Sequence, residues 1–388
     1  MNTFSKTTAI IFPLVLGSVL ISGYSNANSI QNTDISFKGY IQLDTLFSQY
    51  SDGSLPAGSI GRDFYVPSLT PVGGAKESTQ FDAHAKRSRF RLTSKTDTGN
   101  GESITGVLEL DFSSTPGGNE RISNSYTPRI RHAYFRYNGW TFGQTWSTFQ
   151  DVKTLPERLD AISVTDGTIF NRQPIVKYQS GAWEFSLENS ESTITPFEGG
   201  SRIVSDDGYV PDAVIRYTHK SDWGHVSLAG LVRQLTYETE IIDDSTISYG
   251  INVSSKIKVG SHDDLRISFT TGSGLGRYLG LNTSRGAVIN SEDNLEAIDS
   301  TGFAVAYRKV WSKKMRSSFS YSKLMIDNNV ALTGTKVTES TSNISANLLY
   351  SPTPKITFGS EIRFATRDIE SGLSGDMTRL QLSARYKF

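Results

Sequence analysis

Beyond residue 34, apolar and polar residues alternate with a period of two along much of the chain. Apolar residues at 35, 37, 41 and 43 alternate with polar residues at 36, 38, 42 and 44. The alternation returns at about 102–113, 265–271 and 301–308. Strands with two unlike faces have this period, whereas an amphipathic helix has a period of 3.6. The pattern therefore predicts an all-β chain.

Short connections between these segments alternate with long ones along the chain. The short turns are Gly139, Ser180-Gly181, Ser221-Asp222, Ser312-Lys313 and 351–354; the long polar stretches are about 51–80, 147–173, 190–209, 272–299 and 327–336. Alternating segments number about 16. An even count, with short turns at one end and long loops at the other, predicts a 16-stranded antiparallel transmembrane β-barrel. The alternative is a soluble β-sandwich, which does not need so many strands.

The end of the chain favours the barrel. In the final segment, Leu380, Leu382 and Tyr386 share one face with Phe388, whereas arginine, glutamine and lysine occupy the other. A terminal phenylalanine on such a strand is typical of outer-membrane barrels. Aromatic residues also gather beside the short turns, as interfacial girdles do; they are Trp140, Trp183, Trp223, Tyr307, Trp311, Tyr350 and Tyr386.

The first 27 residues are typical of a secretory signal peptide. Lys6 precedes an apolar run from Ala9 to Ile21, and small residues stand before a cleavage point after Ala27. We therefore expect a signal peptide at 1–27 and an outer-membrane barrel domain at 28–388. A membrane anchor is the weaker alternative, because a spanning helix needs about 20 apolar residues.

Composition excludes several classes of protein. Lys and Arg number 39, as do Asp and Glu, so no basic excess suits nucleic acid. The chain has no cysteine, and its five histidines are scattered without a zinc-binding spacing. No grouping of nucleophile, base and orienting residue stands out. We expect no enzyme activity, cofactor or metal site. A structural or adhesin protein remains a second alternative.

The positions of the arginines predict a basic lumen. Arg87, Arg89 and Arg91 share one face of their segment. On the lipid face each would cost about 2–4 kcal/mol at mid-depth, so we expect them in the aqueous lumen that about 16 strands enclose. Arg129 and Arg131 should share a face as well, with His132 and Tyr134 on the other. Arg136 breaks this parity, which predicts a bulge or an interfacial position. The predicted pore-lining residues are Arg87, Arg89, Arg91, Arg129, Arg131, Arg172 and Lys38.

The segment from Ser147 to Gln173, after the fifth strand, is long enough to need a structural reason. It carries four carboxylates, at Asp151, Glu157, Asp160 and Asp166. We expect it to fold inward as a constriction loop that sets these carboxylates opposite the arginines. The alternative is an outer-surface loop with no gating role.

Several motifs resemble the DcaP-like porins. They are GYIQLD at 39–44, DFYVP at 63–67, PVGG at 71–74, FDAHAKRSRF at 81–90, RHAYFRY at 131–137, FGQTWSTFQD at 142–151 and FNRQPIVKY at 170–178. The resemblance implies a 16-stranded homotrimeric channel in the outer membrane of a Gram-negative bacterium. It also implies passive diffusion of small hydrophilic solutes, with a leaning to dicarboxylates and other small anions, and carries over the pore role of Arg87, Arg89, Arg131 and Arg172. Some members have a coiled-coil segment between the leader and the barrel; we expect none here, because only Asn28 to Ser36 lie between the expected signal peptide and the barrel. We would place the trimer contact on the first and last few strands.

Within porins, the alternative to anion preference is a general, weakly selective or cation-preferring channel. The row of arginines favours anions, whereas Asp44, Glu109, Asp111 and the loop carboxylates argue for a mixed lumen.

Overall fold

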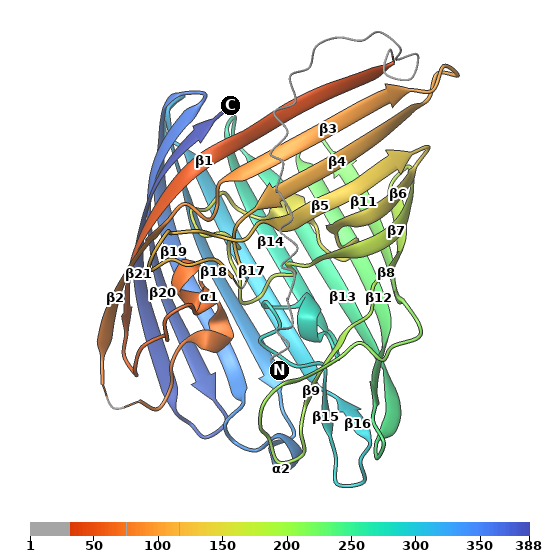
Figure 1. Ribbon diagram of the computed structural model, residues 1–388, viewed down its shortest axis with the longest axis vertical. Helices are drawn as coiled ribbons and strands as arrows, with labels where there is room; N and C mark the ends of the chain where they lie inside the picture. The colour runs from red at the N-terminus through yellow and green to blue at the C-terminus, as the bar shows by residue number, and fades with distance from the viewer. Residues whose placement is uncertain (1–31, 75, 116) are drawn as a thin grey trace, which may run out of the picture.

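The computed structural model describes residues 32–388, except 75 and 116, and is a closed β-barrel (Figure 1). The signal peptide expected at 1–27 lies outside the described residues. Within the described part, no helix is long and apolar enough to cross a membrane.

Sixteen antiparallel strands make the wall, as the alternation predicts. They are β1 (Thr33–Tyr50), β2 (Ser78–His84) with β3 (Arg89–Asp97) as two parts of one strand, β4 (Ser103–Asp111), β5 (Arg129–Tyr137), β6 (Trp140–Trp146), β7 (Arg172–Ser180), β8 (Trp183–Glu188), β11 (Asp212–Ser221), β12 (Gly224–Glu238), β13 (Asp243–Val259), β14 (Asp263–Ser273), β17 (Asp299–Val310), β18 (Met315–Asp327), β19 (Thr338–Thr353), β20 (Ile356–Ile369) and β21 (Ser374–Lys387). The first strand pairs with the last, from Tyr40 opposite Lys387 to Tyr50 opposite Met377, and this closes the barrel.

The two faces of each strand meet different surroundings. In β1, Gln42 and Asp44 are buried inside the barrel, whereas Ile41 and Leu43 are exposed on its outer surface. The final strand follows the same rule, with Arg379 buried and its apolar neighbours exposed outside. An outer surface of apolar side chains matches the apolar band of a transmembrane barrel.

Two irregularities reset which side chains face inward. In the ladder between β4 and β5, Arg131 is an extra residue, a β-bulge that flips the parity of β5. The ladder thus contains the bulge that is one of the two explanations predicted from Arg136. The expectation that His132 and Tyr134 face away from the arginines is wrong, because after the flip both residues share the inner face with Arg136. A similar break at 85–88 separates β2 from β3 and contains Arg87.

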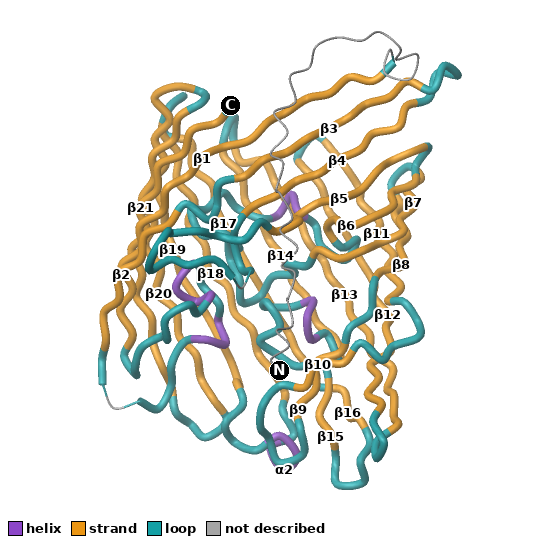
Figure 2. Tube along the Cα trace, in the orientation of Figure 1, coloured by secondary structure: helices purple, strands orange, loops and turns teal. Residues whose placement is uncertain are grey.

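Six long connections gather at one end of the barrel: L1 (51–77), L2 (112–128), L3 (147–171), L4 (189–211), L6 (274–298) and L7 (328–337) (Figure 2). They contain the short elements α1 (Ile60–Asp63), η1 (Pro67–Leu69), η2 (Val152–Thr154), β9 (Ser192–Thr195), β10 (Ile203–Ser205), η3 (Gly276–Tyr278), β15 (Ala287–Ile289), β16 (Leu295–Ala297) and α2 (Val330–Thr333). Strands β10, β9, β15 and β16 form a second sheet that joins L4 to L6.

Part of the barrel interior is a packed apolar core made by the loops. Phe149 and Ile169 of L3 pack with Leu275 and Tyr278 of L6 against inward-facing side chains of β11, β12 and β18. Loop L1 packs its Leu55 and Tyr65 against β1, β20 and β21 in the same way. The loops therefore fill the interior beside β11, β12, β18, β20, β21 and the loop end of β1, and leave the rest of the inner face from β1 to β5 as the polar side.

Candidate functional site

The arginines predicted from the sequence gather on one inner surface. We call this surface the basic wall; it consists of Lys38, Arg87, Arg89, Arg91, Arg129 and Arg131. Strands β1, β3 and β5 and the break before β3 carry these residues, and β4 lies between β3 and β5. Burying so many cations toward lipid would be costly, whereas a water-filled lumen keeps them solvated. The alternation of each strand, reset by the two irregularities, turns these side chains inward.

Glu109 of β4 lies at the centre of the basic wall, and its carboxylate contacts three arginines. Its carboxylate accepts a hydrogen bond from Arg131 Nε at 3.0 Å. It also lies 3.4 Å from Arg89 Nη1 and 3.7 Å from Arg91 Nη1. The Arg131 side chain is 7% exposed, but that of Arg91 is 42% exposed. Arg91 is thus the member of this group most open to a passing solute.

Asp111, two residues further along β4, holds Arg129 and also a second nitrogen of Arg131. Arg129 donates to both of its oxygens at 2.9 Å, and Arg131 Nη1 donates to Asp111 at 2.9 Å. Bidentate contacts of this kind fix the guanidinium plane as well as its position. Four arginines of the basic wall therefore share two carboxylates, which leaves a local excess of two positive charges.

The two ends of the basic wall are less tightly paired. Arg87 is buried in the break between β2 and β3, with Nη1 4.0 Å from Asp44 Oδ1. Lys38 is exposed and lies opposite Arg91 in the ladder. Tyr40, on the same face of β1, lies beneath the guanidinium groups of Arg89 and of Arg385 in β21. Tyr40 is not among the residues predicted from the sequence, although its spacing of two from Lys38 puts both side chains on one face.

Arg172 differs from the other predicted residues. The ladder pairs it with Trp146, and its strand neighbour on the same face, Pro174, is exposed on the outer surface. Its guanidinium lies 4.4 Å from the Trp146 ring centre and 5.5 Å from that of Phe170. The register alone therefore does not put Arg172 on the inner face, and its role in the pore stays a prediction.

The first two loop carboxylates are bound to the wall opposite the arginines. Loop L3 does fold into the barrel. Asp151 binds His225 Nε2 of β12 at 2.6 Å, and Glu157 accepts two hydrogen bonds of 2.6 Å from Arg316 of β18. Burial alone would raise the pKa of Glu157, but the hydrogen bonds and charge of Arg316 hold the pKa below its usual value.

The other two loop carboxylates are more deeply enclosed. Asp160 accepts from the backbone N–H of Tyr65 at 2.9 Å, and Asp166 accepts from the Tyr65 hydroxyl at 2.9 Å. Asp166 is also bound by Asn343 and by Ser322. Burial raises the pKa of Asp166. All four carboxylates thus anchor L3 rather than present free charge. The expected arrangement, carboxylates facing arginines across a gap, is not what these contacts form.

Other inward cations also hold the loops in place. Arg363 of β20 donates to the Ser163 carbonyl of L3 at 2.8 Å, and Arg158 of L3 donates to the Ser345 carbonyl at 3.1 Å. Arg233 of β12 donates to the Glu191 carbonyl of L4 at 2.6 Å. These contacts join residues far apart in sequence, so strand parity predicts the inward direction but not the anchoring role.

A barrel of this size, with an inward loop and a charged inner wall, is the architecture of an aqueous channel. The protein-family model described as "DcaP outer membrane protein" matches residues 14–388. The chain belongs to the DcaP outer membrane protein family. No curated protein matches it. This DcaP-family chain is therefore an outer-membrane porin channel of the Gram-negative type, as its sequence predicts.

Solved structures agree with this family at the level of the fold. The crystal structure of the outer membrane channel DcaP of Acinetobacter baumannii superposes with a TM-score of 0.76 at 24% identity, covering 92% of this chain and 98% of that one. An anion-selective porin from Comamonas acidovorans gives 0.57 at 10% identity, covering 92% and 100%. The trimer form of Vibrio cholerae OmpT gives 0.54 at 10% identity, with the same coverage. The family and these neighbours are channels, not enzymes.

Proposed function

We propose that this DcaP-family porin passes small hydrophilic solutes by diffusion and favours small anions, dicarboxylates among them, at the basic wall. The observation that carries the proposal is the sharing of two carboxylates, Glu109 and Asp111, among four arginines. An excess of positive charge beside an aqueous path raises the local concentration of anions and lowers that of cations.

The anchoring of L3 supports the same direction of selectivity. A cation-preferring pore would need uncompensated carboxylates facing the path. Asp151 and Glu157 are instead bound by a histidine and an arginine, and the other two loop carboxylates are buried. The basic wall thus meets little opposing charge from L3.

The test is the reversal potential of the purified protein in a planar bilayer under a KCl gradient. The double variant Arg89→Gln/Arg91→Gln removes the two excess charges. One unit charge about 7 Å from an ion in water changes the energy of that ion by about 0.6 kcal/mol, and screening at about 0.1 M salt roughly halves this energy. Because the charge acts with opposite sign on chloride and potassium, it changes the ratio of their permeabilities about threefold. We therefore expect the ratio of chloride to potassium permeability to fall about tenfold, to the level of a weakly selective channel.

The matched control is Lys313→Gln/Lys314→Gln, which removes two charges from the exposed short turn between β17 and β18. It should leave the reversal potential unchanged. A wild-type reversal potential of cation sign would contradict the proposed anion preference. So would an arginine variant whose reversal potential is unchanged, like that of the control. Heat-modifiable gel migration reports whether each variant has folded.

We also propose that the porin is a homotrimer. Support comes from the unequal lengths of the strands around the barrel. Strand β6 has 7 residues and β8 has 6, whereas β13 has 17. At about 3.4 Å per residue and a tilt of about 40°, seven residues rise only about 18 Å, less than the apolar band of about 25 Å. Where the barrel strands are this short, contact with a neighbouring subunit covers the membrane thickness that the strands do not span. An inserted trimer should close in three equal current steps at high voltage; single-step closure would count against it.

A further inference from the structure

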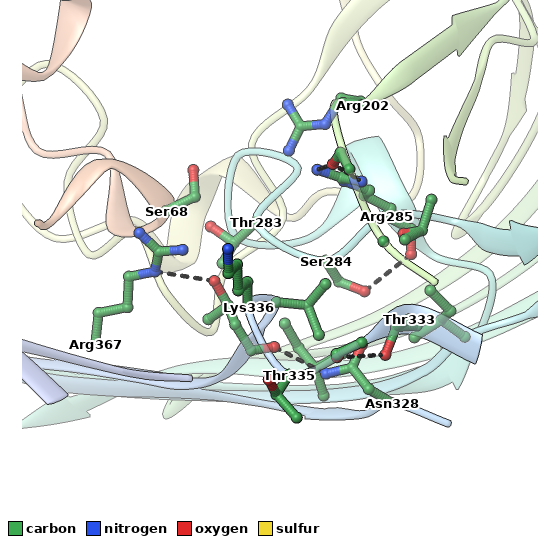
Figure 3. A pocket seen from close by; sticks show the side chains of 18 of the residues that line it. Ser68, Arg202, Thr283, Ser284, Arg285, Asn328, Thr333, Thr335, Lys336 and Arg367 are labelled. Carbon is green, nitrogen blue, oxygen red and sulfur yellow. Dashed lines mark hydrogen bonds between the residues drawn. The ribbon is translucent and has the colours of Figure 1, made fainter. Parts of the chain in front are cut away.

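A second group of cations, separate from the basic wall, lies among the long loops. It lines a pocket of about 690 Å³, which we call the mouth pocket. The pocket is bounded by L1, L4, L6, L7 and the end of β20, and its cations are Arg202, Arg285, Lys336 and Arg367. Figure 3 shows Arg367 and Ser68 on one side of the pocket and Arg202 and Arg285 on the other, with Lys336 between them.

Three of the four cations, the arginines, are held in place by hydrogen bonds that do not neutralise them. Arg285 donates two hydrogen bonds of 3.1 Å to the Gly200 carbonyl, and Arg202 donates to the Asn282 carbonyl at 2.6 Å. Arg367 donates to the Thr70 carbonyl at 3.1 Å. Among the described residues, none of the four forms a salt bridge with a carboxylate, unlike most arginines of the basic wall. Neutral carbonyl acceptors orient the guanidinium groups but leave their charge uncompensated.

One acidic residue, Glu198, lines the same pocket. Its side chain is exposed, and it makes no salt bridge to a described cation. Burial, helped by the charge of Arg202, lowers the pKa of Arg285 to about 10, so that Arg285 stays charged at neutral pH. Four positive charges against one negative charge leave the mouth pocket strongly basic.

The shape of the pocket indicates what it can bind. Its volume is within the range of small-molecule sites, about 300–1,000 Å³, and is far larger than one chloride ion needs. Its cations come from opposite sides, and the hydroxyls of Ser68 and Thr335 add hydrogen-bond donors. Such a site suits a small organic molecule that carries two or more separate anionic groups. A lipid headgroup on the barrel exterior is a poorer fit, because loops and the inner end of β20 surround the pocket.

We propose that the mouth pocket is a capture site that binds small organic di- and trianions on the extracellular side before they reach the basic wall. This deepens the proposed anion preference and rests on it. Electrostatic capture acts mainly on the rate of association, and it weakens as salt screens the charges. It should therefore make the rate of solute entry depend on the side from which the solute is added.

The test uses citrate, added to one side of a planar bilayer that holds the full-length channel, and counts blocking events per unit time. In Lys336→Gln we expect the event rate for citrate from the long-loop side to fall about threefold at low salt, and in Lys336→Gln/Arg202→Gln about tenfold. The rate from the short-turn side should not change. The event rate for acetate, which has one anionic group, should fall only slightly in the same variants.

The absence of cysteine from the chain allows a charge-restoration control. Lys336→Cys, treated from one side with a trimethylammonium methanethiosulfonate, should regain the wild-type citrate rate, whereas a sulfonate-bearing reagent should lower it further. The side that reacts also gives the orientation of the inserted channel. Lys336 makes no hydrogen bond within the described residues, so its replacement should not disturb the loops.

The two proposals can fail separately. Equal citrate rates for wild type and the mouth variants, with an intact anion-sign reversal potential in KCl, would overturn the capture site alone. A cation-sign reversal potential would overturn the basic wall whatever the mouth variants do. A citrate rate that falls equally from both sides would also overturn capture, because the variants would then be changing the pore itself.

Discussion

At the scale of single residues, Glu109 is the group on which the charge balance of the pore depends. It is buried on the inner face of β4, and three arginines of the basic wall converge on it. Removing one partner of a buried charged pair normally leaves the other uncompensated and destabilises the fold. Here Arg89 and Arg91 are partly exposed to the lumen, and the buried Arg131 keeps its hydrogen bond to Asp111, so the main effect should be on ion preference.

We predict opposite effects for two substitutions at this site. Glu109→Gln keeps an oxygen acceptor for Arg131 but removes one negative charge, so the ratio of chloride to potassium permeability should rise about threefold; Arg91→Gln should lower it by about the same factor. Reversal potentials in a KCl gradient measure both. Changes of the same sign in the two variants would show that perturbed packing, not charge, governs selectivity.

At the scale of elements, loop L3 is seated by close backbone contact as well as by its carboxylates. A Cβ atom on Gly167 would overlap the backbone N, C and O atoms of Phe303 in β17. On the facing strand, a Cβ atom on Gly302 would lie 2.9 Å from Gly167 Cα. Only glycine at both positions lets the loop lie directly on the wall.

Gly167→Ala should therefore lift L3 from β17 without preventing the barrel from forming. We expect noisier single-channel currents and faster trypsin cleavage after Lys153, while heat-modifiable migration is retained. The matched control is Gly230→Ala on β12, where an added Cβ would meet only Ile215 at 3.5 Å. Quiet currents and unchanged proteolysis in Gly167→Ala would mean that L3 adjusts without leaving the wall.

These elements also show how far the sequence leads. Period-two alternation is a local property, so it predicts the strands and the inward direction of Arg89 and Arg91. A bulge changes the parity of every residue after it in the strand, so alternation alone puts His132 on the wrong face. The anchoring of Asp166 by Tyr65 joins residues 101 positions apart. No local pattern carries such a contact.

At the scale of the whole molecule, one part of the interior is packed with loops and the other part is the polar side. The loop core of L3 and L6 packs against β12 and β18, which have 15 and 13 residues, and against β11, which has 10. The polar side and most of the low strands, β4 to β8, lie on the other part of the wall. This division moves the expected trimer contact from the first and last strands toward β4 to β8, where a barrel standing alone would leave part of the membrane thickness uncovered.

A pair of outward-facing substitutions tests this placement. Leu108 on β4 and Ile251 on β13 are both exposed apolar residues, 42% and 50% exposed in the single chain. If β4 to β8 meet a neighbouring subunit, Leu108→Lys buries a charge in the contact, and the trimer should dissociate to monomers on native gels. Ile251→Lys would face lipid, where a charge costs about 2–4 kcal/mol at mid-depth and less near the interface. That cost lowers the unfolding temperature of the barrel but leaves the trimer whole. A trimer that survives Leu108→Lys and dissociates with Ile251→Lys would put the contact on the tall wall instead, and the height of the strands would then need another explanation.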